Sequence, residues 1–225
     1  MGTRILLTLI WLGFIAYSFT LAPPQQPDTN DLILRLSTGD WQGINPAVVA
    51  LFNAMGIWPM IYACLALADG HYQKLAAWPF VVGSFGLGAF LLLPYLILRR
   101  PQPVAALGVP SPLLESRWTG GLLLLGAVLV MGYGLWAGDW ADFWEQWRSS
   151  RFIHVMGLDF CLLWGLLPTL LRDDMARRNW QSPWTFWLTT LVPLVGGAGY
   201  LLLRPGTSPG TPTTPAAAIT STSGD

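Results

Sequence analysis

Six apolar stretches follow one another along the chain, and each is long enough to form a membrane-spanning helix. They are residues 5–22, 47–68, 77–98, 119–137, 152–171 and 184–203. A helix needs about 20 apolar residues to cross the hydrocarbon core of a bilayer. Only 11% of the residues are charged, whereas a soluble domain carries about 25%. The sequence therefore predicts an all-α fold, an integral membrane bundle of about six transmembrane helices within residues 1–204.

The composition also excludes several classes of partner and site. The formal net charge is zero, which argues against a nucleic acid as partner. Cys64 and Cys161 both fall inside apolar stretches, so we expect buried hydrophobic residues and no disulfide framework. No spacing typical of a metal site occurs. Membrane lipids are the expected surroundings.

The two ends of the chain have different expected fates. Arg4 precedes the first apolar stretch, and Pro23 and Pro24 follow it where a signal peptide would be cleaved. A retained helix is favoured over a cleaved signal, because the apolar run is long for a signal peptide. Residues 205–225 are rich in Pro, Gly, Ser and Thr, which predicts a disordered tail.

Short amphipathic segments are expected at the membrane surface. One lies near Leu32 to Leu36, between the first and second stretches. In the other, four aromatic residues recur at helical spacing and share one face; they are Trp140, Phe143, Trp144 and Trp147. This face either anchors the helix at headgroup depth or docks a partner.

Charged residues gather in two loops of the six-span arrangement. They are Arg99, Arg100, Arg172, Asp173, Asp174, Arg177 and Arg178. Arginine-rich loops favour the cytoplasm, which predicts cytoplasmic loops here and both termini on the other side. The run RDDMARR holds paired carboxylates that could bind Mg²⁺, but it matches neither DDxxD nor DGxxAR. A charged cap on the fifth helix is the favoured interpretation. Since no other catalytic motif is present, we expect a non-enzymatic protein.

Histidine offers one route to a cofactor. The chain has two histidines, His71 and His154. In the six-span arrangement both lie near the same membrane face, where a histidine could ligate a haem iron or a chlorophyll magnesium. An ordinary interfacial histidine is the favoured alternative.

Asp159 is the residue whose placement in an apolar stretch costs the most free energy. Counted along its helix it lies roughly 12 Å deep, where a charged carboxylate costs on the order of 3 kcal/mol or more. It must be protonated or find a partner on another helix, for which Ser84, Tyr133 and Tyr62 are the candidates. Asn53 lies nearer the opposite face. Both polar residues either fix the bundle by hydrogen bonds, which is favoured, or serve a proton or ion path.

Three segments of the chain resemble a known family. They are LFNAMGIWPMIYACLALADG, AWPFVVGSFGLGAFLLLPYLILRR and SRFIHVMGLDFCLLWGLLPTLLRDDMARR. Together they are similar to a family of multi-pass membrane proteins of cyanobacteria and chloroplasts that has no assigned activity. The resemblance covers most of residues 51–178. It implies the thylakoid or plasma membrane of a cyanobacterium, and with it a photosynthetic membrane complex as partner.

Three functions are therefore expected, in order of preference. The first is an accessory, assembly or interaction factor in a photosynthetic membrane, with no cofactor. The second is a small carrier or proton-handling protein that uses Asp159. The third is a pigment- or haem-binding protein that uses His154.

Overall fold

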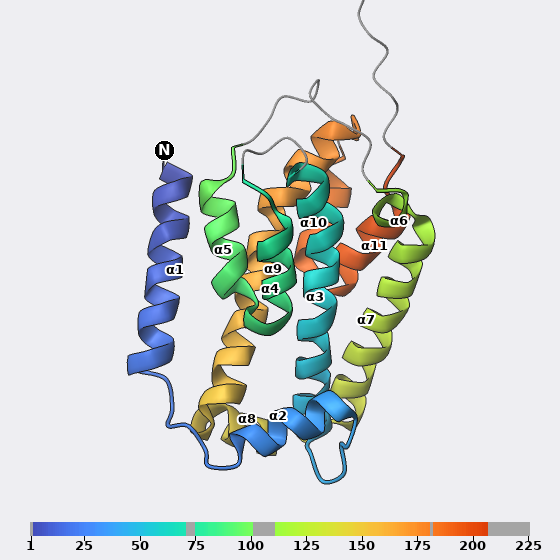
Figure 1. Ribbon diagram of the computed structural model, residues 1–225. Helices are drawn as coiled ribbons and strands as arrows, with labels where there is room; N and C mark the ends of the chain where they lie inside the picture. Colours follow the sequence, from blue (N-terminus) through green and yellow to red (C-terminus); the bar gives the residue numbers. More distant parts are fainter. Residues whose placement is uncertain (1, 71–74, 101–110, 181, 207–225) are drawn as a thin grey trace, which may run out of the picture.

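The computed structural model describes residues 2–70, 75–100, 111–180 and 182–206 (Figure 1). Every regular element in these ranges is a helix, which confirms the all-α class. In chain order the helices are α1 (Gly2–Thr20), α2 (Thr29–Thr38), α3 (Pro46–Gly70), α4 (Trp78–Leu87), α5 (Ala89–Leu98), α6 (Pro112–Glu115), α7 (Arg117–Ala137), α8 (Trp140–Ser149), α9 (Arg151–Arg177), α10 (Pro183–Leu191) and α11 (Val195–Leu203). Of the tail predicted for residues 205–225, all but residues 205 and 206 lie outside the described ranges.

Four helices are long and apolar enough to cross a membrane, namely α1, α3, α7 and α9. They match four of the six apolar stretches. Close packing among the helices is allowed by small residues. A side-chain carbon at Gly134 of α7 would lie 2.5 Å from the Cβ of Ala50 in α3, and one at Gly120 would lie 2.5 Å from the backbone of Leu202 in α11.

The stretch 77–98 is not one helix, because it folds back on itself at Gly88. This glycine has φ +48° and ψ −128°, a conformation that side-chain-bearing residues rarely adopt. The rings of Phe80, near the start of α4, and Tyr95, near the end of α5, lie 6.0 Å apart. Helices α4 and α5 are therefore antiparallel and form a hairpin (Figure 1).

The stretch 184–203 is divided in the same way. Helices α10 and α11 are separated by a turn in which Leu194 has φ +61°. The ring of Trp180, just before α10, stacks at 5.7 Å on the ring of Tyr200, near the end of α11. The outer ends of α10 and α11 therefore lie together, and this segment is a second hairpin.

The two hairpins change where the chain termini lie. Arg4 in the first turn of α1 donates a hydrogen bond of 3.0 Å to the carbonyl of Arg99. Arg204 at the end of α11 lies 3.3 Å from Asp174 in the last turns of α9. Both ends of the described chain thus share one end of the bundle with the arginine-rich segments, at the top of Figure 1. The expectation that the termini lie opposite these segments was wrong, because two of the six stretches turn back within the bundle instead of running from one end to the other.

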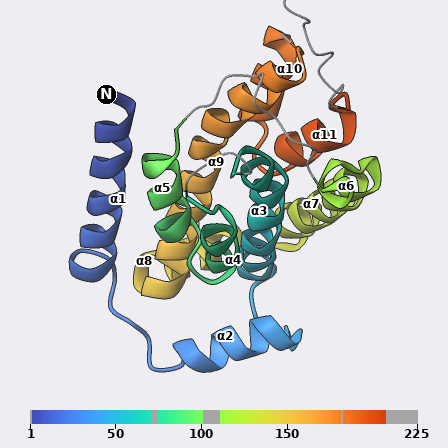
Figure 2. The same cartoon turned by 45° about the horizontal axis from the view of Figure 1, so that its top comes forward.

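The other end of the bundle is covered by α2 and α8, as Figures 1 and 2 show. Both segments predicted to be amphipathic are therefore helices. Leu36 of α2 packs with Val48, Ile153 and Met156 in a buried cluster. Leu32 and Leu36 of α2, and Phe143 and Trp147 of α8, pack inward against this cluster of α3 and α9 residues, as apolar residues of an amphipathic helix do.

Candidate functional site

Asp159 of α9 is buried against the tip of the α4–α5 hairpin. Its Oδ1 atom accepts a hydrogen bond of 2.7 Å from the backbone N–H of Ala89, the first residue of α5. The first N–H groups of a helix have no partner within the helix, so Asp159 caps α5. Its Oδ2 atom lies against Gly88, where a Cβ would be only 1.7 Å away. The absence of a side chain at Gly88 is what lets the carboxylate reach the tip.

The partner of Asp159 comes from another helix, as expected, but it is a backbone group. The hydroxyl groups named as candidates bond elsewhere or face outward. Ser84 donates to the carbonyl of Val81 in its own helix, and Tyr62 donates to the carbonyl of Leu163. Tyr133 is exposed on α7.

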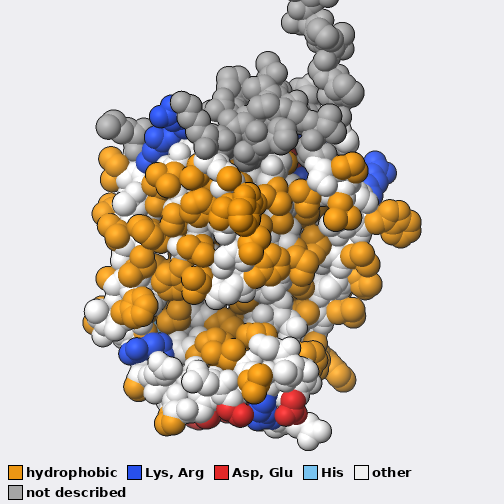
Figure 3. Space-filling model, viewed as in Figure 1, with side chains coloured by type: hydrophobic (Ala, Val, Ile, Leu, Met, Phe, Trp, Pro, Cys, Tyr) orange, Lys and Arg blue, Asp and Glu red, His pale blue; other side chains and the backbone are white. Residues whose placement is uncertain are grey.

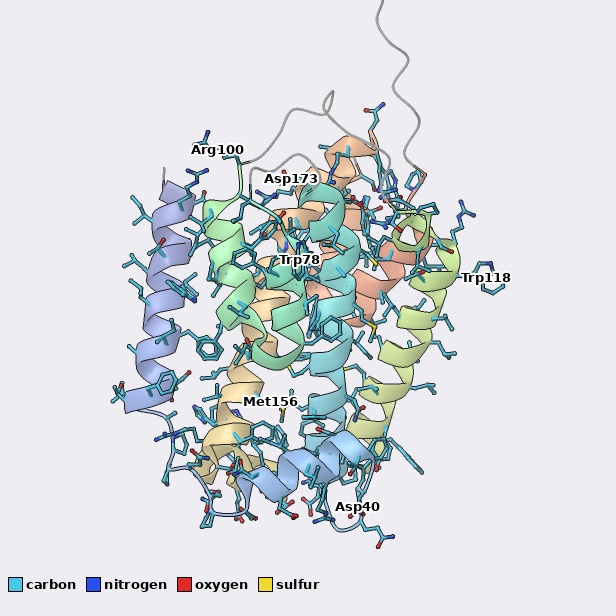
Figure 4. The ribbon with its side chains drawn as sticks, in the orientation of Figure 1. Asp40, Trp78, Arg100, Trp118, Met156 and Asp173 are labelled. Carbon is cyan, nitrogen blue, oxygen red and sulfur yellow. The ribbon has the colours of Figure 1, made fainter. Side chains whose placement is uncertain are left out.

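A cavity of about 540 Å³ lies beneath the hairpin tip and ends at Asp159. Figure 4 labels Met156, one of its lining residues, in the space between the tip and α2. Gln25, Asn30 and Arg151 line the cavity near the surface helix, and they make this end of it polar. Its walls carry five phenylalanines, which are Phe19, Phe52, Phe85, Phe90 and Phe152. This size and lining are typical of a small-molecule site.

Two polar atoms that line this cavity lack a protein hydrogen bond. Ser18 of α1 is only 5% exposed, and its Oγ has no partner in the described part of the chain. The Oδ2 atom of Asp159 accepts no hydrogen bond from the described residues either, since its only bond there is made through Oδ1. Buried polar groups are almost always hydrogen-bonded. These two atoms therefore mark where a bound molecule would find partners.

His154 uses both ring nitrogens within the protein. Nδ1 lies 2.9 Å from the carbonyl oxygen of Trp147, and Nε2 lies 2.9 Å from the hydroxyl of Tyr17. Because a carbonyl only accepts, Nδ1 carries the proton and the Tyr17 hydroxyl donates to Nε2 in neutral His154. Ligation of a haem iron or chlorophyll magnesium through Nε2 would require breaking the bond to Tyr17. His71 lies outside the described residues.

Asn53 is not part of the cavity that ends at Asp159. Its side chain donates a hydrogen bond of 2.8 Å to the carbonyl of Val49, one turn earlier in α3. Such a bond within one helix links no second helix. A role for Asn53 in a path with Asp159 therefore has no support from the geometry.

The aromatic helix α8 divides its four rings between the interior and the surface. Phe143 and Trp147 pack against the cluster around Leu36, while Trp140 and Trp144 remain 50% and 47% exposed. All four rings line an apolar groove of about 340 Å³ bounded by α3, α7, α8 and α9. Cys161 also lines it and is exposed, so the expectation that both cysteines are buried was wrong for this one.

The charged segments make buried hydrogen bonds and ion pairs at the end of the bundle where the chain termini lie. Asp174, 1% exposed, accepts hydrogen bonds from Arg178 at 2.8 Å and from Tyr200 at 2.7 Å. Arg178 also donates to Glu115 of α6 at 2.7 Å. Burial lowers the pKa of Arg178, but its bonds to Glu115 and Asp174 outweigh burial and raise that pKa above its ordinary value.

A second set of hydrogen bonds joins the end of α5 to α9. Arg99 donates to Asp173 at 2.6 Å and to the carbonyl of Thr169 at 2.8 Å. Asp173 and Asp174 thus serve different partners, and no group of three or more His, Cys, Asp or Glu side chains in the described ranges is arranged to hold a metal ion. Of the other predicted loop residues, Arg177 donates to the carbonyl of Asp173.

Two arginines remain near the outside of this end. Arg172 is exposed, and its guanidinium lies 5.1 Å from the centre of the Phe186 ring. Arg100 is labelled near the start of a grey trace in Figure 4. Most of the charged residues at this end therefore make hydrogen bonds and ion pairs within the bundle, and Arg99, Asp174 and Arg178 are buried.

No protein-family model, curated protein or solved structure matches the chain. The family resemblance therefore rests on the three sequence segments alone. Since a fold does not by itself define a function, the function has to be inferred from the cavity and the groove.

Capping of α5 by Asp159 predicts that the two obvious replacements differ. In Asp159→Asn the amide oxygen still accepts from Ala89, so stability should be close to that of the wild type. Asp159→Leu leaves that N–H unpaired and should lower the free energy of unfolding by about 1–2 kcal/mol. Thermal unfolding in a mild detergent measures both, with Glu145→Leu on the exposed side of α8 as a control. Equal stability of the Asn and Leu variants would contradict the cap.

Proposed function

We propose that the chain is an integral membrane protein with four spanning helices and two re-entrant hairpins, and that it binds a small molecule in the cavity that ends at Asp159. The observation that carries this proposal is a cavity beneath the α4–α5 tip that is lined by Ser18 and Asp159. The buried Oγ of Ser18 has no hydrogen-bond partner in the described chain, and Asp159 makes its hydrogen bond there through Oδ1, which leaves Oδ2 toward a ligand. Carrier proteins build their sites in this way, from discontinuous helices whose ends meet inside the membrane. A small non-enzymatic carrier or binding protein is the function this geometry supports best.

The membrane setting is supported by the outer surface. Large apolar side chains are exposed along the spanning helices, as on α1 (Leu6, Leu9) and α7 (Leu122, Leu125). Figure 3 shows hydrophobic side chains over most of the visible face and acidic ones at its lower edge. Non-helical backbone is tolerated at membrane depth only where it is covered by protein or lines a cavity. The tip at Gly88 meets this condition, because it lines the cavity and α5 is capped by Asp159.

The orientation follows from the distribution of arginines between the two ends. The described part of the chain has eight at the end to which the hairpins open, which are Arg4, Arg99, Arg100, Arg117, Arg172, Arg177, Arg178 and Arg204. It has three at the other end, which are Arg35, Arg148 and Arg151. The positive-inside rule favours the cytoplasm for the arginine-rich end and hence for both termini. The end of the cavity lined by Gln25, Asn30 and Arg151 then lies toward the opposite side, which in a cyanobacterium is the thylakoid lumen or the periplasm.

Access to the cavity from that side is testable with a small thiol reagent. Ser18→Cys, in a background where Cys64 and Cys161 are replaced by alanine, should react with a membrane-impermeant methanethiosulfonate added from the non-cytoplasmic side. Thr189→Cys is the matched control, because Thr189 is a buried hydroxyl residue outside the cavity. A Ser18→Cys variant no more reactive than Thr189→Cys would contradict an open binding cavity.

A second candidate function, an accessory role in a photosynthetic membrane complex, is favoured by the half-exposed rings of α8. Trp140→Ser combined with Trp144→Ser should preserve insertion but remove co-purifying proteins if this face docks a partner. Trp147 is left intact because its ring packs on His154, with centres 4.0 Å apart. Trp118→Ser with Trp136→Ser, both exposed on α7, is the control. If every partner still co-purifies with the variant, the α8 face does not dock a partner and serves only as a membrane anchor.

A further inference from the structure

The unsatisfied groups in the Asp159 cavity are suited to hydrogen-bond donors. The Oδ2 atom of Asp159 is an acceptor when the carboxyl is ionised, and the Ser18 hydroxyl both accepts and donates. The last turn of α4, Ser84 to Leu87, lines the same part of the cavity. The final carbonyls of a helix carry the negative end of its dipole. The backbone N–H of Ala89, a donor at this tip, is already used by Asp159.

Positive charge on the protein is kept at the other end of the cavity. Arg151 is the only Lys or Arg among the described lining residues, and its Nε donates at 2.9 Å to the carbonyl of Pro23. Arg151 begins α9, and Asp159 follows eight residues later. At 1.5 Å per residue the two are roughly 12 Å apart along the helix. Among the described residues, the part of the cavity around Asp159 therefore holds one carboxylate and no basic side chain.

The walls between these ends are aromatic. The five phenylalanines that line the cavity supply apolar area for a hydrocarbon body. The face of an aromatic ring also attracts a cation placed within about 6 Å of its centre. A carboxylate at the end of a phenylalanine-walled cavity is a combination that suits a positively charged, partly apolar molecule.

We propose that the ligand of this cavity is an organic ammonium ion with an apolar body. This inference rests on the proposed binding function and names its ligand class. An ammonium group has up to three N–H donors and no acceptor, so it can donate to Asp159 Oδ2, and the Ser18 hydroxyl is a further acceptor in the cavity lining. The hydrocarbon part of the ligand lies along the phenylalanines. A carboxylate ligand would be repelled by Asp159, and a neutral alcohol would form a weaker bond than a charged donor does.

Three probes with one body separate these alternatives, namely 4-phenylbutylamine, 4-phenylbutan-1-ol and 4-phenylbutanoate. Binding to the full-length protein in lipid nanodiscs is measured by isothermal titration calorimetry. The amine should bind most tightly. In Asp159→Asn its affinity should fall by about tenfold to a hundredfold, while the affinity for the alcohol should change little. Glu145→Gln removes an exposed carboxylate outside the cavity and should leave all three affinities unchanged.

The outcomes distinguish this inference from the function on which it rests. If the alcohol or the acid binds the wild type as tightly as the amine, the cavity binds small molecules but the ammonium assignment is overturned. The same holds if a folded Asp159→Asn variant keeps its affinity for the amine. If Asp159→Asn does not fold, the order of the three probes on the wild type decides. Failure of all three to bind would contradict the binding function itself.

Discussion

Replacing Asp174 with leucine should lower the free energy of unfolding by about 3–5 kcal/mol, because two buried arginines, Arg178 and Arg204, then share the single carboxylate of Glu115. Asp174 is 1% exposed and bonds to Arg178 and Tyr200, with Arg204 at 3.3 Å. These contacts fasten the α10–α11 hairpin to the end of α9. Loss of the carboxylate should therefore loosen this hairpin before the rest of the bundle, which hydrogen exchange of α10 and α11 would detect.

Asp173→Leu is the matched control, since it removes the neighbouring carboxylate on the same helix. The side chain of Asp173 is 32% exposed, and Arg99 has a second bond to the carbonyl of Thr169. The expected loss is about 1 kcal/mol, because partly exposed ion pairs are worth little. Thermal unfolding of both variants in one detergent gives the comparison. A loss for Asp174→Leu no larger than for Asp173→Leu would contradict the buried network.

Gly88→Ala is the second large effect we expect. The backbone conformation at Gly88, φ +48° and ψ −128°, costs an alanine about 1–3 kcal/mol. The new Cβ would also lie 1.7 Å from Asp159 Oδ2, so the carboxylate must leave the tip and α5 loses its cap. The variant should therefore lose about 2–4 kcal/mol of stability in all.

Gly86→Ala is the control for this prediction, two residues earlier in the same hairpin. A Cβ at Gly86 would meet no atom within 4 Å, and alanine is favoured over glycine in a helix by up to about 1 kcal/mol. The two substitutions should therefore change the unfolding temperature in opposite directions. A change of the same sign and size in both would contradict the close contact of Gly88 with Asp159 at the hairpin tip.

The sequence predicted the four long helices because length and apolar content are enough to define them. It did not predict the hairpins, because the length and apolar content of a stretch are the same whether it forms one spanning helix or two half-length helices. A signal was nevertheless present. Glycines at 83, 86 and 88 interrupt the middle of one stretch, and Pro193 is followed by Gly196 and Gly197 in the other.

The candidate site was found only in part. Asp159 stood out because a carboxylate is costly in an apolar stretch, but its partner is a backbone N–H that becomes free only where the helix breaks. Ser18 gave no signal, since a serine in such a helix commonly bonds to its own backbone, as Ser84 does. Asp174 and Arg178 were expected in loops, and they are buried because a returning hairpin covers the end of α9.

Cysteine labelling from each side of the membrane tests the four-span arrangement most directly. In a cysteine-free background, Ser111→Cys and Gly206→Cys probe the end to which both hairpins open, and Thr38→Cys and Glu145→Cys probe the other; all four positions are exposed. A membrane-impermeant maleimide should label Ser111→Cys and Gly206→Cys from one side, the cytoplasmic one, and Thr38→Cys and Glu145→Cys from the opposite side. Six complete spans would instead separate Ser111 from Gly206 and Thr38 from Glu145, and that labelling pattern would contradict the re-entrant hairpins.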